Sequence, residues 1–316
     1  MLLQLFIIIP LLALILDLIF QDPEHWPHPV RLIGGILDKC ESWSRNQNYL
    51  SLQTCGIITL VISTILVGAV VYYLQNIWLL GFFISIYLAY AGISLGGLIS
   101  TSRHIINLVQ QDNLPEARTK LGELVTRDTS HMDREDIYKT LAESCSENLN
   151  DGFVAPFFFL LLGGPVLLWI YKTVSTMDSM WGYKNETWRE LGWAGARADD
   201  FLAWVPARIT AGLVIAGAFI MGLNWRNALD LTSTQAVEMQ SPNAGYPMAA
   251  IALGLEGTMG GDAEYFGEEV FKPLLGPYNN EWTDFKIEQL QNLLVLCSFL
   301  WVLMGLSVMY IIYCIL

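Results

Sequence analysis

The chain has 316 residues, of which 53% are hydrophobic and only 15% charged, and its mean hydropathy is +0.43. These values exclude an ordinary soluble domain and indicate a membrane protein. The formal net charge of −13 argues against a nucleic-acid partner or an anionic membrane surface. The five cysteines form no CxxC pair and are interpreted as free thiols.

Six apolar stretches approach the length of about 20 residues that spans a bilayer. They cover residues 2–20, 55–74, 77–101, 153–174, 201–223 and 293–316. The polar segments between them cover residues 21–54, 102–152, 175–200 and 224–292. The first stretch has no basic n-region and no small-residue cleavage site, so we expect a retained span. The pattern predicts an all-α, polytopic membrane protein that forms a single integral membrane domain over 1–316, with broken or re-entrant segments and helical or loop extramembrane regions.

The stretch 153–174 is interrupted by Gly163, Gly164 and Pro165. A kinked span and a re-entrant hairpin are both compatible with this pattern, because broken backbone at membrane depth is tolerated where it is buried in protein or lines a cavity. We predict the hairpin, with both ends on one membrane face. If 201–223 crosses, the segment 224–292 lies on the opposite face, and Tyr265–Glu268 can join the site only where that stretch is broken too, with Pro206 as the candidate position.

The polar segments contain further helix signals. Pro115 is expected in the first turn of a helix that opens at Asn113 or Leu114. A second helix is predicted from Asp133 to Asn150, with Asp136 three positions after the cap. The glycine- and proline-rich part from 241 to 277 is predicted to be mostly loop, with a short apolar stretch at 248–255.

A polar loop, DPEHWPHPVR at 22–31, follows the first apolar stretch. Its three prolines predict a stiff, non-helical backbone. That backbone would display Asp22, His25, His28 and Arg31 at the membrane surface, a combination able to bind phosphate and to transfer protons. The alternative interpretation is an interfacial anchor.

Three acidic residues, Glu143, Glu147 and Asp151, are spaced i, i+4, i+8 and are expected to share one helical face. Like charges at this spacing repel each other, and a divalent cation would relieve the repulsion. A solvated acidic face is the alternative.

A third group of charges flanks the stretch that begins at residue 201. Its members are Lys172, Asp178, Lys184, Arg197, Asp199, Asp200 and Arg208. Paired acids beside bases suit a magnesium nucleotide or an acyl phosphate. Asp199 and Asp200 are also expected where a helix begins, and helix-dipole complementarity would explain them equally well. Arg208 lies deeper and needs an anionic partner.

The glycine-rich run from 254 to 267 is neither a Walker A loop nor a GxGxxG fingerprint. It is a weak signal by itself.

These segments resemble, in order and spacing, the motifs of the CbiB/CobD family of cobalamin biosynthesis. The resemblance is carried by DPEHWPHPVRLIG at 22–34, Arg127–Ser130, the stripe from Glu143 to Gly152, residues 155–158, the block 171–208, Ser241–Asn243 and Tyr265–Gly267. It implies ATP-dependent joining of 1-amino-2-propanol, or its O-phosphate, to a propionate carboxylate of adenosylcobyric acid, with adenosylcobinamide (phosphate) as product and an acyl phosphate as intermediate. The corrinoid, the amino alcohol and the lipid bilayer are the expected partners, together with other enzymes of the pathway.

Residue chemistry assigns the roles that this reaction requires. We expect catalytic groups at Asp22, His25, His28 and Arg31, with a histidine as base for the amine. ATP and phosphate are expected at Lys172, Asp178, Lys184, Arg197, Arg208, Ser241 and Asn243. Magnesium is expected at Glu143, Glu147, Asp151, Asp199 and Asp200.

Two alternatives remain open, an AmpE-like membrane signalling protein without ligase activity and a transporter with a broken helix. The segment 102–152 carries the most basic residues of the polar segments, which favours a cytoplasmic side for it. We therefore expect the protein in the cell (inner) membrane, with its active site facing the cytoplasm.

Overall fold

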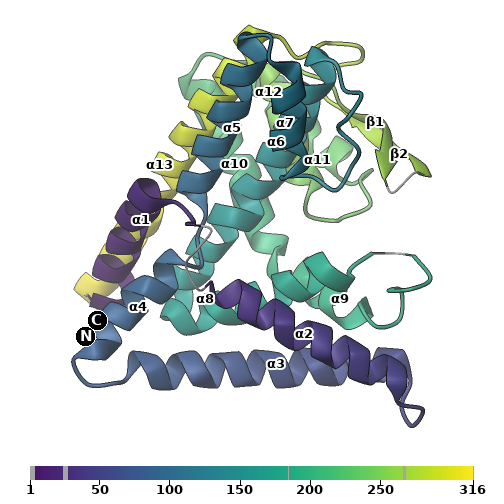
Figure 1. The fold of residues 1–316 in the computed structure, drawn as a ribbon. Coiled ribbons are helices and arrows are strands. Elements are labelled where there is room, and N and C mark those ends of the chain that lie inside the picture. Colours follow the sequence, from purple (N-terminus) through teal and green to yellow (C-terminus); the bar gives the residue numbers. More distant parts are fainter. Residues whose placement is uncertain (1–3, 24–27, 184, 266–267, 316) are drawn as a thin grey trace. The chain divides into compact units, whose positions relative to one another are not determined.

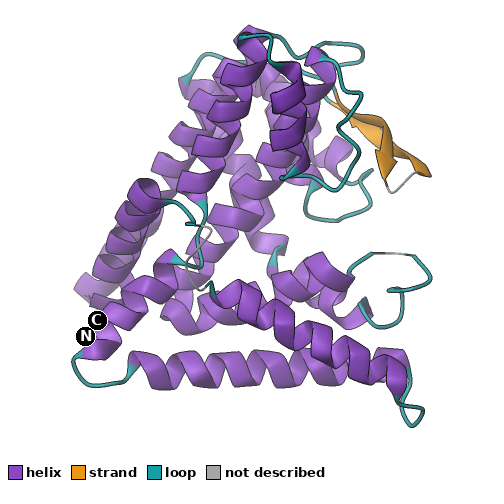
Figure 2. Ribbon diagram, in the orientation of Figure 1, coloured by secondary structure: helices purple, strands orange, loops and turns teal. Residues whose placement is uncertain are grey.

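The computed structural model describes residues 4–23, 28–183, 185–265 and 268–315. Within this part, four helices are long and apolar enough to cross a membrane, or five if two short helices separated by one residue are counted together. Nearly every element is a helix, and one pair of strands is present (Figure 2). The predicted all-α, polytopic membrane fold is confirmed. The chain divides into two compact units, each built from separate sequence segments.

Unit 1 contains residues 1–94, 155–203 and 304–316. Its elements are the π-helix η1 (Gln4–Ile8), α1 (Ile9–Phe20), α2 (Pro29–Asn46), α3 (Leu52–Gln75), α4 (Leu80–Tyr90), α8 (Ala155–Trp181), α9 (Trp193–Leu202) and the end of α13 (Asp284–Ile315) (Figure 1). The predicted span 55–74 corresponds to α3, and the predicted span 77–101 corresponds to α4 together with the following helix α5 (Leu95–Gln110). The apolar helix over Phe6–Phe20 is shorter than a full span.

The second half of α8 packs against α3 and α4. The indole Nε1 of Trp169 donates a hydrogen bond to the carbonyl of Leu88 at 2.9 Å, and both residues are buried. On the α3 side, a Cβ at Gly68 would lie 3.2 Å from Ile170, so the missing side chain permits a close approach of the helices. Small residues at such contacts are typical of helix packing in membranes.

The predicted break at Gly163–Pro165 is confirmed. Gly163 (φ −152°, ψ 24°) and Gly164 (φ 65°, ψ −160°) are non-helical inside α8. The rings of Phe159 and Tyr171 stack across the break, with centroids 4.8 Å apart, whereas a straight helix would separate these positions by about 18 Å. A straight crossing of 153–174 is therefore excluded, while the shared membrane face of its two ends stays a prediction.

Unit 2 contains residues 95–154 and 204–303. Its elements are α5 (Leu95–Gln110), α6 (Leu114–Gly122), α7 (Arg134–Asn148), the π-helix η2 (Leu149–Val154), α10 (Trp204–Ile220), α11 (Trp225–Ala236), α12 (Gly245–Leu255), the strands β1 (Met259–Tyr265) and β2 (Glu268–Leu275), and most of α13. The helix predicted around Pro115 is α6, and the one predicted from Asp133 is α7.

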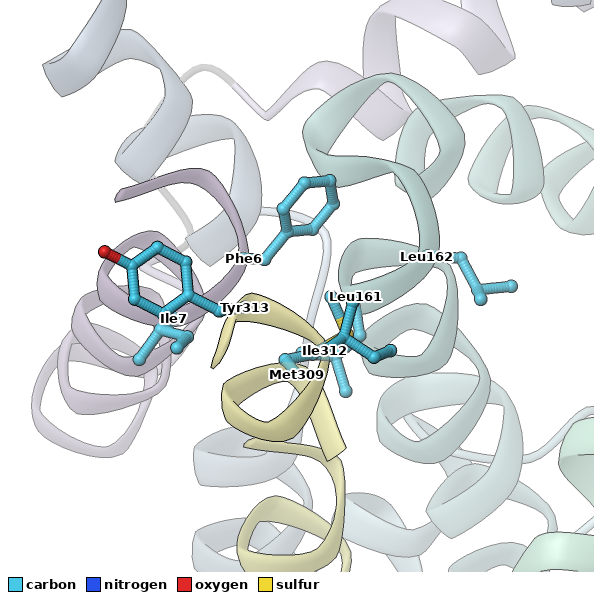
Figure 3. A pocket seen from close by; sticks show the side chains of 7 residues that line it. All are labelled: Phe6, Ile7, Leu161, Leu162, Met309, Ile312 and Tyr313. Carbon is cyan, nitrogen blue, oxygen red and sulfur yellow. The ribbon is translucent and has the colours of Figure 1, made fainter. Parts of the chain in front are cut away.

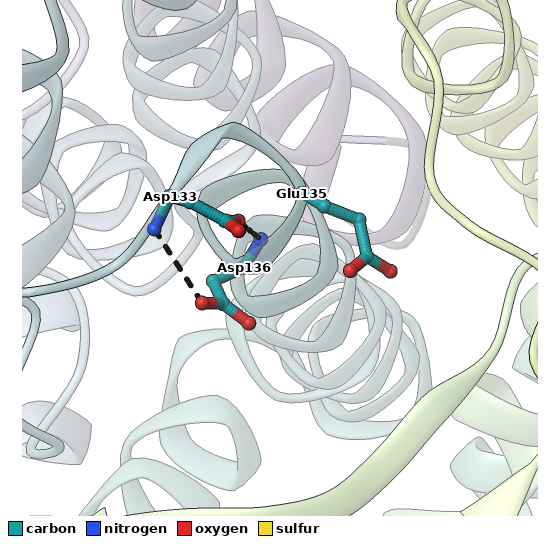
Figure 4. Close-up of side chains that lie close together, drawn as sticks. All are labelled: Asp133, Glu135 and Asp136. Carbon is teal, nitrogen blue, oxygen red and sulfur yellow. Dashed lines mark hydrogen bonds between the residues drawn. The ribbon is translucent and has the colours of Figure 1, made fainter.

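The start of α7 is fixed by a reciprocal capping box. The carboxylate of Asp133 accepts a hydrogen bond from the Asp136 amide at 2.9 Å, and that of Asp136 accepts one from the Asp133 amide at 3.4 Å (Figure 4). Negative side chains in the first turn also complement the helix dipole. The predicted N-terminus of this helix is confirmed.

Three local predictions are wrong. The loop 22–31 ends earlier than expected, because α2 begins at Pro29 and Arg31 lies in its first turn. Proline is favourable at the first helical position because no amide hydrogen is needed there and its ring presets a helical φ. The break in 201–223 falls at Ala203, between α9 and α10, and Pro206 again lies in a first turn. The segment 241–277 is not mostly loop, because it forms α12 and an antiparallel β1–β2 hairpin.

We predict that Gly164→Ala destabilises the protein by about 1–3 kcal/mol, because the φ and ψ of Gly164 lie in a region that is essentially restricted to glycine. Gly212→Ala is the matched control, since Gly212 is exposed in α10 and a Cβ there meets nothing within 4 Å. Alanine should stabilise that helix slightly. Thermal unfolding of both variants in detergent checks the prediction, and equal midpoints would contradict it.

Candidate functional site

The predicted catalytic loop is ordered by a helix cap. His28 is the N-cap residue of α2, and its Nδ1 accepts a hydrogen bond from the amide of Val30 at 3.2 Å. Nδ1 is thus the acceptor nitrogen and Nε2 carries the hydrogen. The predicted catalytic residue His25 lies outside the described residues.

Four predicted site residues interact electrostatically in unit 1. Burial lowers the pKa of His28 below its ordinary value of 6.5; the positive charges of Lys172 and Arg31 lower it further, and Asp22 opposes the shift. Nε2 of His28 lies 3.8 Å from a carboxylate oxygen of Asp22. The structure therefore brings Lys172, predicted for phosphate, to the predicted catalytic loop.

The other predicted residues of unit 1 lie on α8 and α9. Asp178 is in the last turn of α8, where a Cβ at Gly182 would lie 2.1 Å from its carboxylate. Arg197 and Asp200 form a 3.8 Å ion pair on α9, and the arginine side chain is 70% exposed, so the pair contributes little to stability. Lys184 lies outside the described residues.

Asp199 and Asp200 do not lie at a helix start, as the sequence analysis expected. They lie in the last turn of α9, which begins at Trp193 and ends at Leu202. The helix dipole is unfavourable for carboxylates at this end. Helix-dipole complementarity therefore does not explain these two acids.

Glu143 is buried in an ion pair that its spacing in the acidic stripe did not predict. One carboxylate oxygen pairs with the guanidinium of Arg127, and the other accepts a hydrogen bond from the amide of Gly260 at 2.8 Å. The side chains of Arg127 and Glu143 are only 9% and 4% exposed. Gly260 lies where the β1–β2 register shifts, which frees its amide for this contact. Arg127 therefore balances the charge of Glu143 without a metal ion.

The acidic stripe also departs from its expected spacing. Glu143 and Glu147 lie on α7, but Asp151 lies on the π-helix η2, whose wider turn interrupts the i, i+4 register. Glu147 is half-buried and interacts electrostatically with Lys272 of β2. Mg²⁺ typically takes one or two carboxylates together with waters and substrate phosphates. Glu147 and Asp151 fit that donor set, whereas both oxygens of Glu143 already bind protein groups.

Among the described residues, the acids whose ligand atoms converge within 4.8 Å are Asp133, Glu135 and Asp136. Two of them form the capping box at the start of α7 (Figure 4). Capping accounts for their proximity. The predicted magnesium residues stay predictions.

Three residues predicted to bind ATP converge in unit 2. Nη1 of Arg208 donates a hydrogen bond to the side-chain oxygen of Asn243 at 3.1 Å. The hydroxyl of Ser241 accepts a hydrogen bond from the backbone N–H of Asn243 at 3.3 Å. The guanidinium also lies over the rings of Trp204 and Tyr246, 4.3 Å and 4.0 Å from their centroids. Stacking and hydrogen bonds hold the cation in one orientation, which suits recognition of an anionic ligand.

An apolar pocket of about 270 Å³ lies in unit 1 (Figure 3). Its lining comes from η1, the first half of α8 and the end of α13. The residues are Phe6, Ile7, Leu161, Leu162, Met309, Ile312 and Tyr313. None of the predicted site residues contributes to it, and its lining offers no charge for a phosphate or a metal.

The sequence pattern predicts no role for Arg127, Trp204 or Tyr246. Arg127 belongs to a segment that carries the family resemblance, so a signal for it was present. Trp204 lies four positions before Arg208 on α10, a spacing that predicts contact on one helical face, whereas Tyr246 is 38 positions away and meets Arg208 only through the packing of α10 and α12.

We predict that His28→Ala lowers stability by about 1 kcal/mol and that His28→Asn retains most of it, since asparagine is a good N-cap. The lowered pKa means that the folded state favours neutral His28. The contribution of His28 to the free energy of unfolding should be complete above about pH 6.5 and should decrease as the pH falls from that value through the lowered pKa of the folded state. Unfolding midpoints between pH 5 and 8 measure this, and His28→Asn should lack this part of the slope. Equal slopes in the two proteins would contradict the prediction.

We predict that Glu143→Gln lowers stability by about 3 kcal/mol, because it leaves Arg127 buried without its counter-charge. The control is Glu123→Gln, which breaks an exposed i, i+3 pair with Lys120 and should cost less than about 1 kcal/mol. Denaturation in detergent compares the two variants. A stable Glu143→Gln protein would contradict the structural role of the pair.

The chain resembles known proteins over nearly its whole length. The model of the CobD/CbiB protein family matches residues 10–294. A cobalamin biosynthesis protein CobD from Leptospira interrogans is 35% identical over 294 residues, covering 92% of this chain and 93% of that protein. Proteins with the same name from Clostridium perfringens and Desulfotalea psychrophila are 34% and 36% identical, covering 97% and 92% of this chain and 98% and 94% of their own. No solved structure matches the chain. This chain therefore belongs to the CobD/CbiB family.

Proposed function

We propose that this protein acts in cobalamin biosynthesis as an ATP-dependent amide ligase. It joins 1-amino-2-propanol, or its O-phosphate, to a propionate carboxylate of adenosylcobyric acid and forms adenosylcobinamide or its phosphate. The observation that carries the proposal is family membership over residues 10–294, together with relatives named cobalamin biosynthesis proteins that match over almost their full length. The same observation favours the ligase over an AmpE-like signalling protein or a transporter.

The chemistry requires activation of the carboxylate. A propionate oxygen attacks the γ-phosphorus of ATP, the bond to the bridging oxygen breaks, and ADP leaves. The amine nitrogen then attacks the acyl carbon, phosphate leaves with the former carboxylate oxygen, and the amine proton passes to a base. Both steps need positive charge around the phosphoryl oxygens.

Positive side chains in both units support this chemistry. In unit 1, Lys172 lies with the loop that contains Asp22 and His28. In unit 2, Arg208 is oriented by Asn243 and by two aromatic rings. We assign phosphate binding to each of these cations within its own unit. Magnesium would supply further charge neutralisation, and Glu147 and Asp151 are its best-fitting ligands.

The cap at α2 changes the assignment of the base. His28 uses its acceptor nitrogen to bind the Val30 amide, so taking a proton there would break the cap. Asp22 is half-exposed and lies beside the imidazole. Of the residues predicted to be catalytic, it is the remaining one within the described residues that can accept a proton. We assign proton acceptance to Asp22 and orientation of the loop to His28.

The apolar helices place the protein in a membrane. We propose that the active site faces the cytoplasm of the cell, where ATP is available, and that the corrinoid and the amino alcohol reach it from that side. The segment 102–152, which has the most basic residues of the polar segments, supports this orientation.

The test uses purified full-length protein in detergent with adenosylcobyric acid, ATP, Mg²⁺ and either amine, and follows product and ADP by liquid chromatography and mass spectrometry. We expect amide product only with all components present. Asp22→Asn should lower kcat about a hundredfold, since loss of a general base costs this order of magnitude. Asp38→Asn, an exposed acid on α2, is the matched control and should retain activity.

Absence of amide product with both amines would reject the ligase and favour the signalling alternative. Corrinoid uptake into vesicles without ATP turnover would favour the transporter. Normal turnover by Asp22→Asn would reject only the assignment of the base.

A further inference from the structure

Two polar side chains are buried in unit 2 beside a predicted magnesium ligand. Asn150 is 2% exposed and Thr210 is 0% exposed. Asn150 lies on η2 next to Asp151, and Thr210 lies on α10, 60 positions away in the sequence. Burying an amide in an apolar environment costs free energy unless it is hydrogen-bonded. The partners of Asn150 therefore indicate what it does.

The three side chains form a directed hydrogen-bond chain. The hydroxyl of Thr210 donates to Oδ1 of Asn150 at 2.9 Å, and Nδ2 of Asn150 donates to Oδ1 of Asp151 at 2.7 Å. With the amide reversed, its oxygen would face the carboxylate and the two would repel. This repulsion selects the amide orientation in which Asn150 presents a hydrogen to Asp151, and the contact with Thr210 holds the amide in place from α10.

The π-helix makes this arrangement possible. In η2 the backbone bonds run i→i+5, and the turn holds one residue more than an α-helical turn. Asn150 is consequently buried against α10 while its neighbour Asp151 is exposed. Single π-turns inside α-helices occur frequently at functional sites.

A purely local explanation does not cover these contacts. The Thr210 hydroxyl is also 2.9 Å from the carbonyl of Pro206, the usual bond of a threonine within a helix. The hydroxyl has one hydrogen, which it shares between this carbonyl and Oδ1 of Asn150, so the helix-internal bond does not account for the second contact. The contact between η2 and α10 adds an orienting function.

We propose that Asn150 and Thr210 are positioning residues that hold the Asp151 carboxylate for a divalent cation. The proposal rests on the proposed function, because it takes Asp151 as a magnesium ligand. Partners behind a metal ligand fix its orientation, and their loss typically weakens metal affinity 10- to 100-fold.

The experiment measures binding of Mn²⁺, a paramagnetic probe for Mg²⁺, to purified full-length protein by electron paramagnetic resonance. The variants are Thr210→Val, which removes the hydroxyl at nearly constant shape, Thr210→Ser, which retains it, and Asp151→Asn. The matched control is Thr232→Val, because Thr232 is 4% exposed and its hydroxyl donates to the Ala228 carbonyl within α11. Thr210→Ala is the second variant if Thr210→Val does not fold.

We expect Asp151→Asn to abolish stoichiometric Mn²⁺ binding and Thr210→Val to weaken it about tenfold. Thr210→Ser and Thr232→Val should bind like the wild type. If Thr210→Val and Thr210→Ala bind as tightly as Thr232→Val while Asp151→Asn does not bind, the positioning role is wrong and the metal assignment stands. If Asp151→Asn binds normally, or the wild type binds no Mn²⁺, both the positioning role and the metal assignment are wrong.

Discussion

The buried pair between Arg127 and Glu143 connects three parts of unit 2. Arg127 lies in the segment before α7, Glu143 lies on α7, and the second carboxylate oxygen of Glu143 binds the amide of Gly260 at the base of the hairpin. Two charges buried this deeply are tolerated only when close ion-pair geometry and further hydrogen bonds offset the cost of removing both from water. The position of the β1–β2 hairpin over the acidic face of α7 depends on this contact. Glu143 is therefore better explained as the anchor of the hairpin than as a member of a cation site.

Helix interruptions are the second organising feature of the chain. Apolar helices cannot expose unpaired backbone groups to lipid, so a break must be enclosed by protein. In α8 the break at Gly163 and Gly164 turns the two halves towards each other, and the ring stack of Phe159 on Tyr171 closes the turn. At η2 the irregular turn is accommodated by a bond between Asn150 and Thr210. The η2 interruption contains the predicted site residue Asp151.

The predicted site residues fall into groups with different surroundings. Asp22, Arg31 and Lys172 surround a histidine that caps a helix, while Ser241, Asn243 and Arg208 meet through hydrogen bonds and stacking. Predictions based on residue chemistry identified these charged residues but grouped them differently, since Lys172 was placed with Arg208 and the structure brings it to Asp22 and His28. They were less successful for roles, because a role depends on which oxygen or nitrogen atoms are already bound. His28 and Glu143 show this most directly.

Composition and local pattern by themselves determined the membrane class, the positions of most helices, the cap at Asp133 and the break at Gly163–Pro165, because these depend on hydrophobicity, on proline and glycine geometry, and on neighbours within one turn. The motifs also indicated the family. Only the tertiary structure decided that Arg127 neutralises Glu143, that the segment after α12 forms strands, and that Thr210 reaches Asn150. Thr210 and Asn150 are 60 positions apart and Arg127 and Glu143 are 16 apart, and the two strands pair across a hairpin, so none of these contacts forms within one helical turn. Their free energy comes from burial and partner geometry, which a one-dimensional pattern does not contain.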